Sequence, residues 1–139
     1  MRGFLLDTNV ISELVKAVPE QRVIMFLIDK PDLWLSTIVL HEMDFGLNLL
    51  PPGHRRDRLS TVLSGFVSKY DNRIVPVGRP EAQQAAMLRA QARRSGRVLH
   101  LADALIAGTA KAHDLAVVTR NAVDFEGLEV KVVNPWQTR

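Results

Sequence analysis

The sequence predicts an α/β fold in which a mainly parallel five-stranded sheet is covered by helices on both faces. Short apolar runs of strand length alternate with longer helical segments, in the order β-α-α-β-α-α-β-α-α-β-β. Strands that are separated by helices pair in parallel, because the crossover returns the chain to the same end of the sheet. The chain has 139 residues, of which 47% are hydrophobic and 24% are charged. This length and composition predict a single domain over residues 1–139.

The first half of the chain contains two of the predicted strands, at residues 2–6 and 33–36. It also contains four predicted helices, at residues 9–17, 20–29, 38–50 and 55–69. Pro19 stands at the start of the second helix, where its missing N–H costs nothing. Pro31 and Asp32 break the chain before the second strand, and Pro51-Pro52-Gly53 stops the helix over 38–50.

The second half contains the other three strands, at residues 73–77, 115–119 and 129–133, and two helices, at 80–95 and 100–113. Pro76 lacks a backbone N–H, so the end of the third strand belongs at a sheet edge. The Ala-rich helix over 80–95 ends near Gly96.

Several classes of protein are excluded or disfavoured by composition. The chain has no cysteine, which rules out disulfides and thiolate metal sites and is compatible with a reducing compartment. The first apolar run ends at Asp7, too early for a signal-peptide core of roughly 7–15 residues. No segment approaches the roughly 20 apolar residues of a membrane span. We therefore expect a cytoplasmic protein without a membrane partner.

The basic residues give mild support for an anionic partner. The net charge is +3 and the pI is about 9.7. The arginines form two clusters, one at Arg55, Arg56 and Arg58 and one at Arg89, Arg93, Arg94 and Arg97. Such clusters are usually solvated helix faces, so charge alone leaves nucleic-acid binding open.

Asp7 stands directly after the first predicted strand, in the segment Leu5-Leu6-Asp7-Thr8-Asn9. It is either a helix N-cap, for which Asp is a favoured residue, or a functional carboxylate. Thr8 and Asn9 are also good caps, so the helix does not need Asp7 for that purpose. The sequence alone leaves the two interpretations about equal.

Glu42 is predicted to project from an apolar face of the helix over 38–50. At helical spacing it shares a stripe with Ile38, Phe45 and Leu49, whereas Asp44 falls on the polar face. A carboxylate on a buried face is costly unless a cation accompanies it. A buried ion pair and a metal or catalytic site are both consistent with this position.

Two further groups of polar residues follow the same logic. Asp103 lies in the first turn of an apolar helix, where the helix dipole also favours an acid. Thr119, Asn121 and Asp124 follow the fourth strand, in a turn whose composition is also ordinary turn chemistry.

In a parallel sheet, the residues that follow the strands meet at one edge. Asp7, Glu42, Asp103 and the turn with Asn121 and Asp124 would then converge. Several carboxylate oxygens without Cys or His suit a hard cation such as Mg²⁺ or Mn²⁺. The four histidines show no zinc-ligand spacing.

The residues described above make the sequence resemble the PIN-domain ribonucleases. The resemblance lies in four ordered motifs: Leu5-Leu6-Asp7-Thr8-Asn9-Val10, Glu42 with Gly46, Ala102-Asp103-Ala104-Leu105-Ile106-Ala107, and Val118-Thr119-Arg120-Asn121 with Asp124-Phe125. Asn134-Pro135-Trp136 is similar to the branch that contains the VapC and FitB toxins. The resemblance covers nearly the whole chain.

The resemblance implies a three-layer PIN-like sandwich and cleavage of RNA phosphodiesters that depends on Mg²⁺ or Mn²⁺. It also implies a toxin that is neutralised by a cognate VapB-like antitoxin, and a homodimer. Asp7, Glu42 and Asp103 match the first three catalytic and metal-binding acids of the family. In many members an Asp stands at the position of Asn121, so the fourth ligand is either Asn121 or Asp124.

Three polar residues, Thr8, Asn9 and Thr119, match family positions that support the acids. In this hypothesis the arginine clusters hold the RNA backbone.

Two alternatives from other functional classes remain. A haloacid-dehalogenase-like phosphohydrolase also begins with a strand and an Asp, but it requires a second Asp where this chain has Asn9. A non-catalytic module could use the same acidic pocket to bind a basic peptide.

Overall fold

Five parallel strands form one sheet in the order β3-β2-β1-β4-β5. The computed structural model describes residues 2–137, so residues 1, 138 and 139 of the predicted domain lie outside the described part. The strands are β1 (Gly3–Leu6), β2 (Leu33–Ser36), β3 (Ile74–Val75), β4 (Leu115–Val118) and β5 (Val132–Val133). The predicted α/β class and the five-stranded sheet are confirmed, and every strand pair in the described chain is parallel.

The six predicted helices are also found, with ends that shift by a few residues. They are α1 (Thr8–Leu14), α2 (Gln21–Asp29), α3 (Thr37–Leu49), α4 (His54–Ser68), α5 (Arg79–Arg94) and α6 (Leu101–Ala112). Three 3₁₀ helices were not predicted: η1 (Asp71–Arg73), η2 (Ala122–Phe125) and η3 (Pro135–Gln137). Pro19 was wrongly placed at the first position of α2, because Glu20 is the N-cap and Pro19 precedes it.

The third and fifth strands are shorter than the predicted segments 73–77 and 129–133. In β3, Ile74 and Val75 pair with the last two residues of β2. Pro76 cannot donate to the ladder, and η1 occupies Asp71–Arg73 on the other side. In β5, the first ladder contact is the bond from Val117 N to Lys131 O, at 2.8 Å. The ends of β3 and β5 therefore depend on which residues pair through backbone hydrogen bonds, and the hydrophobic pattern alone does not determine them.

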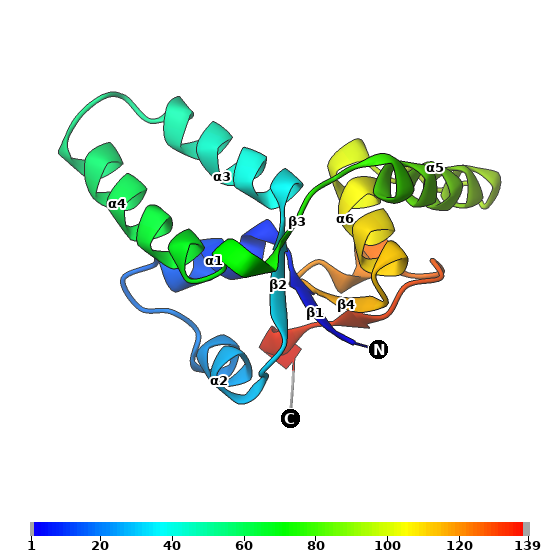
Figure 1. Ribbon diagram of the computed structural model, residues 1–139, viewed down its shortest axis with the longest axis horizontal. Coiled ribbons are helices and arrows are strands. Elements are labelled where there is room, and N and C mark those ends of the chain that lie inside the picture. Colours follow the sequence, from blue (N-terminus) through cyan, green and yellow to red (C-terminus); the bar gives the residue numbers. More distant parts are fainter. Residues whose placement is uncertain (1, 138–139) are drawn as a thin grey trace.

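Helices cover the sheet on two sides, with α1 and α2 on one side and α5 and α6 on the other (Figure 1). Helices α3 and α4 form a hairpin that extends from the body, with its turn far from the strands (Figure 1). The core consists of aliphatic side chains from the central strands and the helices against them, including the fully buried Leu5, Leu6, Leu35, Val117 and Val118. No described helix has the length and apolarity needed to cross a membrane.

The strand order places a topological switch point at the carboxyl ends of β1 and β4. From the central strand β1 the chain moves outward to β2 and β3, then crosses back to β4 and β5 on the other side of β1. The connections that leave β1 and β4 therefore part in opposite directions at this switch point. Open parallel sheets bind ligands at such points. The residues that directly follow β1 and β4 are Asp7 and Thr119.

Helices α5 and α6 pack closely because Gly108 has no side chain. A Cβ atom at position 108 would lie 2.5 Å from the backbone N of Ala85 and 2.7 Å from the carbonyl oxygen of Glu81. Both atoms belong to the backbone of α5, so they cannot turn away as a flexible side chain would. The Gly108 contact therefore fixes the distance between the two helices.

We expect Gly108→Ala to lower the free energy of unfolding by about 1–3 kcal/mol, because the added methyl group overpacks a backbone contact. Urea denaturation monitored by circular dichroism measures this change. Gly65→Ala in α4 is the matched control, because a Cβ there meets nothing within 4 Å. It should raise stability by roughly 0.5–1 kcal/mol through helix propensity. Equal effects of the two substitutions would contradict the packing argument.

Candidate active site

Asp7 lies at the carboxyl end of β1 and is buried, with 6% of its surface exposed. It is the N-cap of α1, and its Oδ1 accepts a hydrogen bond from Thr8 N at 2.7 Å. The expectation that Thr8 or Asn9 would cap this helix is wrong, since the helix begins at Thr8. Capping and a functional role are compatible, because the carboxylate keeps further lone pairs on both oxygens.

The second oxygen of Asp7 joins the ends of two strands. Thr119 Oγ1, directly after β4, donates to Asp7 Oδ2 at 2.8 Å, and Asn9 Nδ2 donates to the same oxygen at 3.2 Å. Asn9 Oδ1 accepts from Arg120 N at 3.1 Å, and Thr119 Oγ1 accepts from Asn121 N at 3.1 Å. Asn9 and Thr119 therefore orient Asp7 and also hold the turn that follows β4.

Glu42 lies on the second turn of α3, which Ser36 caps by accepting a hydrogen bond from Val39 N at 3.4 Å. Its side chain is half-buried. The predicted buried stripe is wrong in part, because Phe45 and Leu49 on that stripe are 55% and 70% exposed. The residues of α3 that face the core are Val39 and Met43. Glu42 therefore lies at the boundary between the core and an exposed apolar surface, and Asp44 is exposed as predicted.

Asp103 lies in the first turn of α6 and is half-buried. Burial raises the pKa of its carboxyl, and the negative charges of Asp7, Asp124 and Glu42 raise it further, against the opposing effect of His100. Burial also raises the pKa of Asp7, to which the charge of Glu42 adds, although hydrogen bonds from Thr119, Thr8 and Asn9 favour its ionised form. Asp103 is therefore close enough to Asp7, Glu42 and Asp124 for their charges to act on it, and Glu42 also acts on Asp7.

The turn after β4 carries Asn121 and Asp124, both exposed. Asn121 is the N-cap residue of η2, and Asp124 lies within η2. Of the two, Asp124 contributes a charge that acts on Asp103.

Arg97 holds this turn from outside and was not predicted to do so. Its Nη2 donates to the carbonyl oxygens of Val123 and Asp124 at 3.1 and 3.2 Å. The sequence placed Arg97 in a basic cluster, and no local pattern distinguishes an arginine that binds carbonyl groups 26 residues away. Arg97 therefore positions the segment that carries Asp124.

The donor set has the chemistry that a hard divalent cation requires. The oxygens are carboxylates without nearby cysteine, and their mutual repulsion is the kind that a cation relieves. Thr8 Oγ1, next to Asp7, is buried without a hydrogen-bond partner. It is therefore available to a water molecule or to a ligand oxygen. Among residues 2–137, however, no three His, Asp or Glu side chains could hold a metal ion as they stand. The acids share one edge, but they would have to move closer together to enclose an ion.

Comparison with known proteins assigns the family. The PIN domain family matches residues 4–129. This chain belongs to the PIN-domain family. The match supports the fold over the haloacid-dehalogenase alternative, consistent with Asn9 at the position where that class needs an Asp.

Its similarity to VapC and FitB proteins extends over nearly the full length. The chain is 40% identical over 136 residues to the VapC ribonuclease Y4jK of Sinorhizobium fredii, covering 96% of this chain and 97% of the relative. It is 38% identical over 135 residues to toxin FitB of Neisseria gonorrhoeae, covering 95% and 97%.

Solved structures agree with this assignment. A chain in the crystal structure of FitAcB from Neisseria gonorrhoeae superposes with a TM-score of 0.91 at 37% identity, covering 97% of this PIN domain and 99% of that chain. A chain in a toxin–antitoxin complex from Klebsiella pneumoniae has a TM-score of 0.70 at 28% identity, covering 96% and 98%. The predicted PIN-like fold is confirmed.

We expect Asp103→Asn to stabilise the PIN domain at neutral pH when EDTA is present. Burial and the neighbouring carboxylates hold the pKa of Asp103 above its ordinary value in the folded state. Its ionised form therefore costs stability above the folded pKa, and that cost disappears as the pH falls through this pKa. Asparagine removes the charge, so the gain is on the order of 0.5 kcal/mol at pH 7, since solvent screens a half-exposed group.

Urea denaturation from pH 8 down to pH 4 measures this difference. The gain should shrink as the pH falls, and Asp44→Asn on the exposed face of α3 should show no such trend. A gain that is independent of pH would contradict the electrostatic explanation.

Proposed function

We propose that this PIN domain is a metal-dependent endoribonuclease and the toxin of a toxin–antitoxin pair. The observation that carries this proposal is the convergence of Asp7, Glu42, Asp103 and Asp124 at one end of the sheet, where their charges act on one another. Full-length similarity to a VapC ribonuclease and to the FitB toxin supports the same reaction class.

In this proposal Asp7, Glu42 and Asp103 hold Mg²⁺ or Mn²⁺, with Asp124 or Asn121 as the fourth ligand. A divalent ion held there would lower the pKa of a bound water molecule and would stabilise negative charge on the phosphate and the leaving oxygen. Asp7 would provide a carboxylate of fixed orientation, because both of its oxygens accept hydrogen bonds, from Thr8 N, Asn9 and Thr119. Thr8 Oγ1 can orient a water molecule or a phosphate oxygen beside Asp7.

The repulsion between the acids explains why a cation is needed before the phosphodiester to be cleaved can enter the acidic edge. A phosphodiester is an anion, and four carboxylates at one edge repel it. Neutralising the carboxylates removes this repulsion, and the negative charge that develops during cleavage then faces a favourable environment. None of these steps needs a nucleophilic side chain, which agrees with a site that consists of carboxylates, amides and hydroxyls.

We expect Asp7→Asn, Glu42→Gln and Asp103→Asn each to reduce RNA cleavage by about 10²–10³-fold, as is typical when a group that stabilises transition-state charge is lost. A labelled single-stranded RNA incubated with Mg²⁺ or Mn²⁺ measures this rate, and EDTA should abolish it. Asp44→Asn is the matched control, because Asp44 lies on α3 two residues from Glu42 but points to solvent. Cleavage by Asp7→Asn at the rate of the parent would overturn the proposal.

We further propose that Asp124, and not Asn121, completes the metal site. Asp124 adds a negative charge that reaches Asp103, whereas Asn121 adds none. Asp124→Asn should weaken Mn²⁺ binding about 10-fold, in the range found for supporting residues of metal sites. Asn121→Ala should weaken it less. Isothermal titration of Mn²⁺ without RNA measures both, and the opposite order of effects would assign the fourth position to Asn121.

The partner in this proposal is a VapB-like antitoxin, and the assembled toxin is a homodimer. Support for the antitoxin comes from the similarity to a chain of the Klebsiella pneumoniae toxin–antitoxin complex. An antitoxin segment with an arginine would pair with the carboxylates that otherwise repel one another. Binding of a basic peptide without metal-dependent cleavage of any RNA would instead identify a non-catalytic module.

A further inference from the structure

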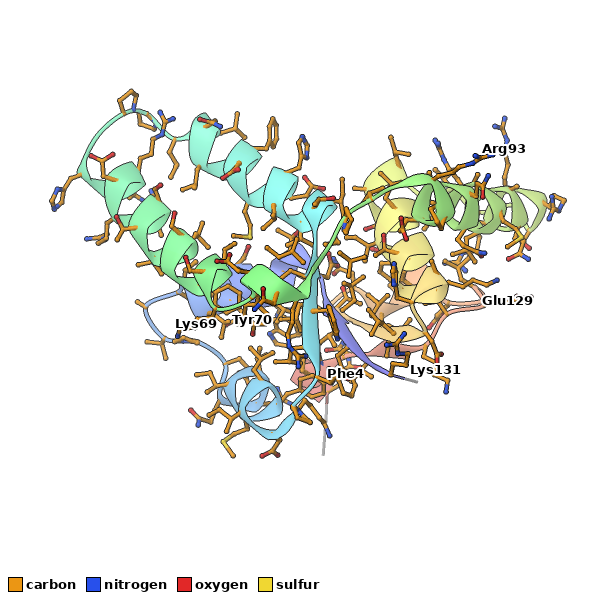
Figure 2. All side chains as sticks on the ribbon, viewed as in Figure 1. Phe4, Lys69, Tyr70, Arg93, Glu129 and Lys131 are labelled. Atoms are coloured by element: carbon orange, nitrogen blue, oxygen red, sulfur yellow. The ribbon has the colours of Figure 1, made fainter. Side chains whose placement is uncertain are left out.

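One of the two arginine clusters is arranged as a row along a helix. Arg89 and Arg93 are four residues apart on α5 and therefore lie on the same face, about 6 Å apart along the axis. Both are exposed, and neither forms a salt bridge with an acid in the part of the chain that the structure describes. Figure 2 shows Arg93 on α5, on the opposite side of the molecule from Lys69 and Tyr70 near the end of α4.

The row borders a groove with a volume of about 600 Å³. One wall consists of α5 residues and the other of the segment that follows α5; the lining includes Ala86, Arg89, Ala90, Arg93, Arg97 and Val98. Ala86 and Ala90 give the α5 wall small apolar side chains, and Val98 is 83% exposed. The groove therefore combines a row of cations with a small apolar surface.

The far wall of this groove continues into the acidic edge. The segment over residues 97–99 leads directly to His100, the N-cap of α6, and to Asp103 in its first turn. Arg97 also holds the turn that carries Asp124, through its bonds to Val123 O and Asp124 O. Arg97 therefore connects the groove to the segment that carries Asp124.

We propose that this α5 groove binds the sugar–phosphate backbone of one RNA strand whose cleaved bond lies at the acidic edge; this inference rests on the proposed function. Guanidinium groups form bidentate hydrogen bonds with phosphates, and a regular row of them suits a polyanion whose charges repeat at regular intervals. One row on one helix contacts one backbone. The apolar surface at Val98 and the alanines accommodates sugars or base faces without requiring a particular sequence.

The other arginine cluster lacks these features. Arg55 and Arg58 lie at the start of α4, with Asp57 between them. This end of α4 is at the outer end of the α3–α4 hairpin, far from the carboxyl ends of the strands (Figure 1). Arg56 is already bonded to Asn48 Oδ1 at 2.8 Å. The α4 cluster therefore provides a control of equal charge on a surface that does not lead to the site.

The test compares Arg89→Gln/Arg93→Gln with the control Arg55→Gln/Arg58→Gln. Binding of a fluorescein-labelled 20-nucleotide polyuridine RNA is measured by anisotropy in EDTA, which prevents cleavage, over a range of NaCl concentrations. We expect the α5 double variant to bind about 10-fold more weakly and to lower the slope of log K against log salt by about 1.4, since each contact to single-stranded phosphate contributes about 0.7. The control should change affinity less than about twofold.

Cleavage assays separate this inference from the proposed function. With the same RNA and Mn²⁺, the α5 double variant should raise KM and leave kcat unchanged, because neither arginine belongs to the acidic site. A trinucleotide too short to reach the groove should be cleaved equally by the parent and the variant. Arg89→Lys/Arg93→Lys should restore most of the binding, because it keeps the charges. Thermal denaturation of each variant checks folding.

Three outcomes would overturn the inference. Equal loss of RNA affinity in both double variants would indicate that RNA binding depends on the net positive charge of the protein and not on the groove. Normal RNA binding by the α5 double variant would show that RNA does not bind at this surface. Loss of self-association or of acidic-peptide binding, with RNA binding intact, would identify a protein interface. If the parent protein binds RNA through the groove but cleaves none, the proposed function is wrong and the RNA-binding role of the groove is kept. If the α5 double variant binds and cleaves RNA like the parent, the RNA-binding role of the groove is wrong and the proposed function is kept.

Discussion

The hydrogen bond from Thr119 Oγ1 to Asp7 Oδ2 is the contact on which the candidate site depends. It joins the ends of β1 and β4, which lie next to each other in the sheet although they are 112 residues apart in the chain. Both residues are buried, and burying a carboxylate is costly unless hydrogen bonds compensate. Asp7 receives such bonds from Thr8 N, Asn9 Nδ2 and Thr119 Oγ1, so its orientation is set by one backbone N–H and two side chains, from the start of α1 and the end of β4. A carboxylate held in this way can serve as the fixed member of a site whose other acids are more exposed.

The acids impose a cost that the rest of the fold has to offset. Burial and mutual repulsion raise the pKa values of Asp7 and Asp103. The sheet compensates with a core of fully buried aliphatic residues directly beneath this edge, including Leu6 and Val118. The arrangement is typical of functional sites, where the protein tolerates local electrostatic strain because a ligand relieves it.

Helices α5 and α6 act together as a support for one side of the site. Gly108 brings the two helices into backbone contact, and this contact fixes the position of α6, which carries Asp103. After α5 the chain turns back through Arg97, whose guanidinium holds the turn with Asp124. Asp103 and Asp124 are therefore positioned by Gly108 and Arg97, neither of which is an acid of the candidate site. A change in the α5–α6 packing would alter the site without touching an acid.

The sequence by itself determined the fold class, the alternation of strands and helices, and the end of the sheet at which the acids meet. Hydrophobic pattern and helix-breaking residues are local signals, and the rule that crossover connections produce parallel strands is general, so Asp7, Asp103 and Thr119 could be placed at one edge without coordinates. The α3 stripe was only half correct, because periodicity shows which residues share a face but not which face meets the core. Tertiary structure alone decided that Asp7 also caps α1, that Phe45 and Leu49 face solvent, and that Arg97 holds the Asp124 turn. Each of these depends on contacts between residues far apart in the chain, and no spacing within a single segment encodes such a contact.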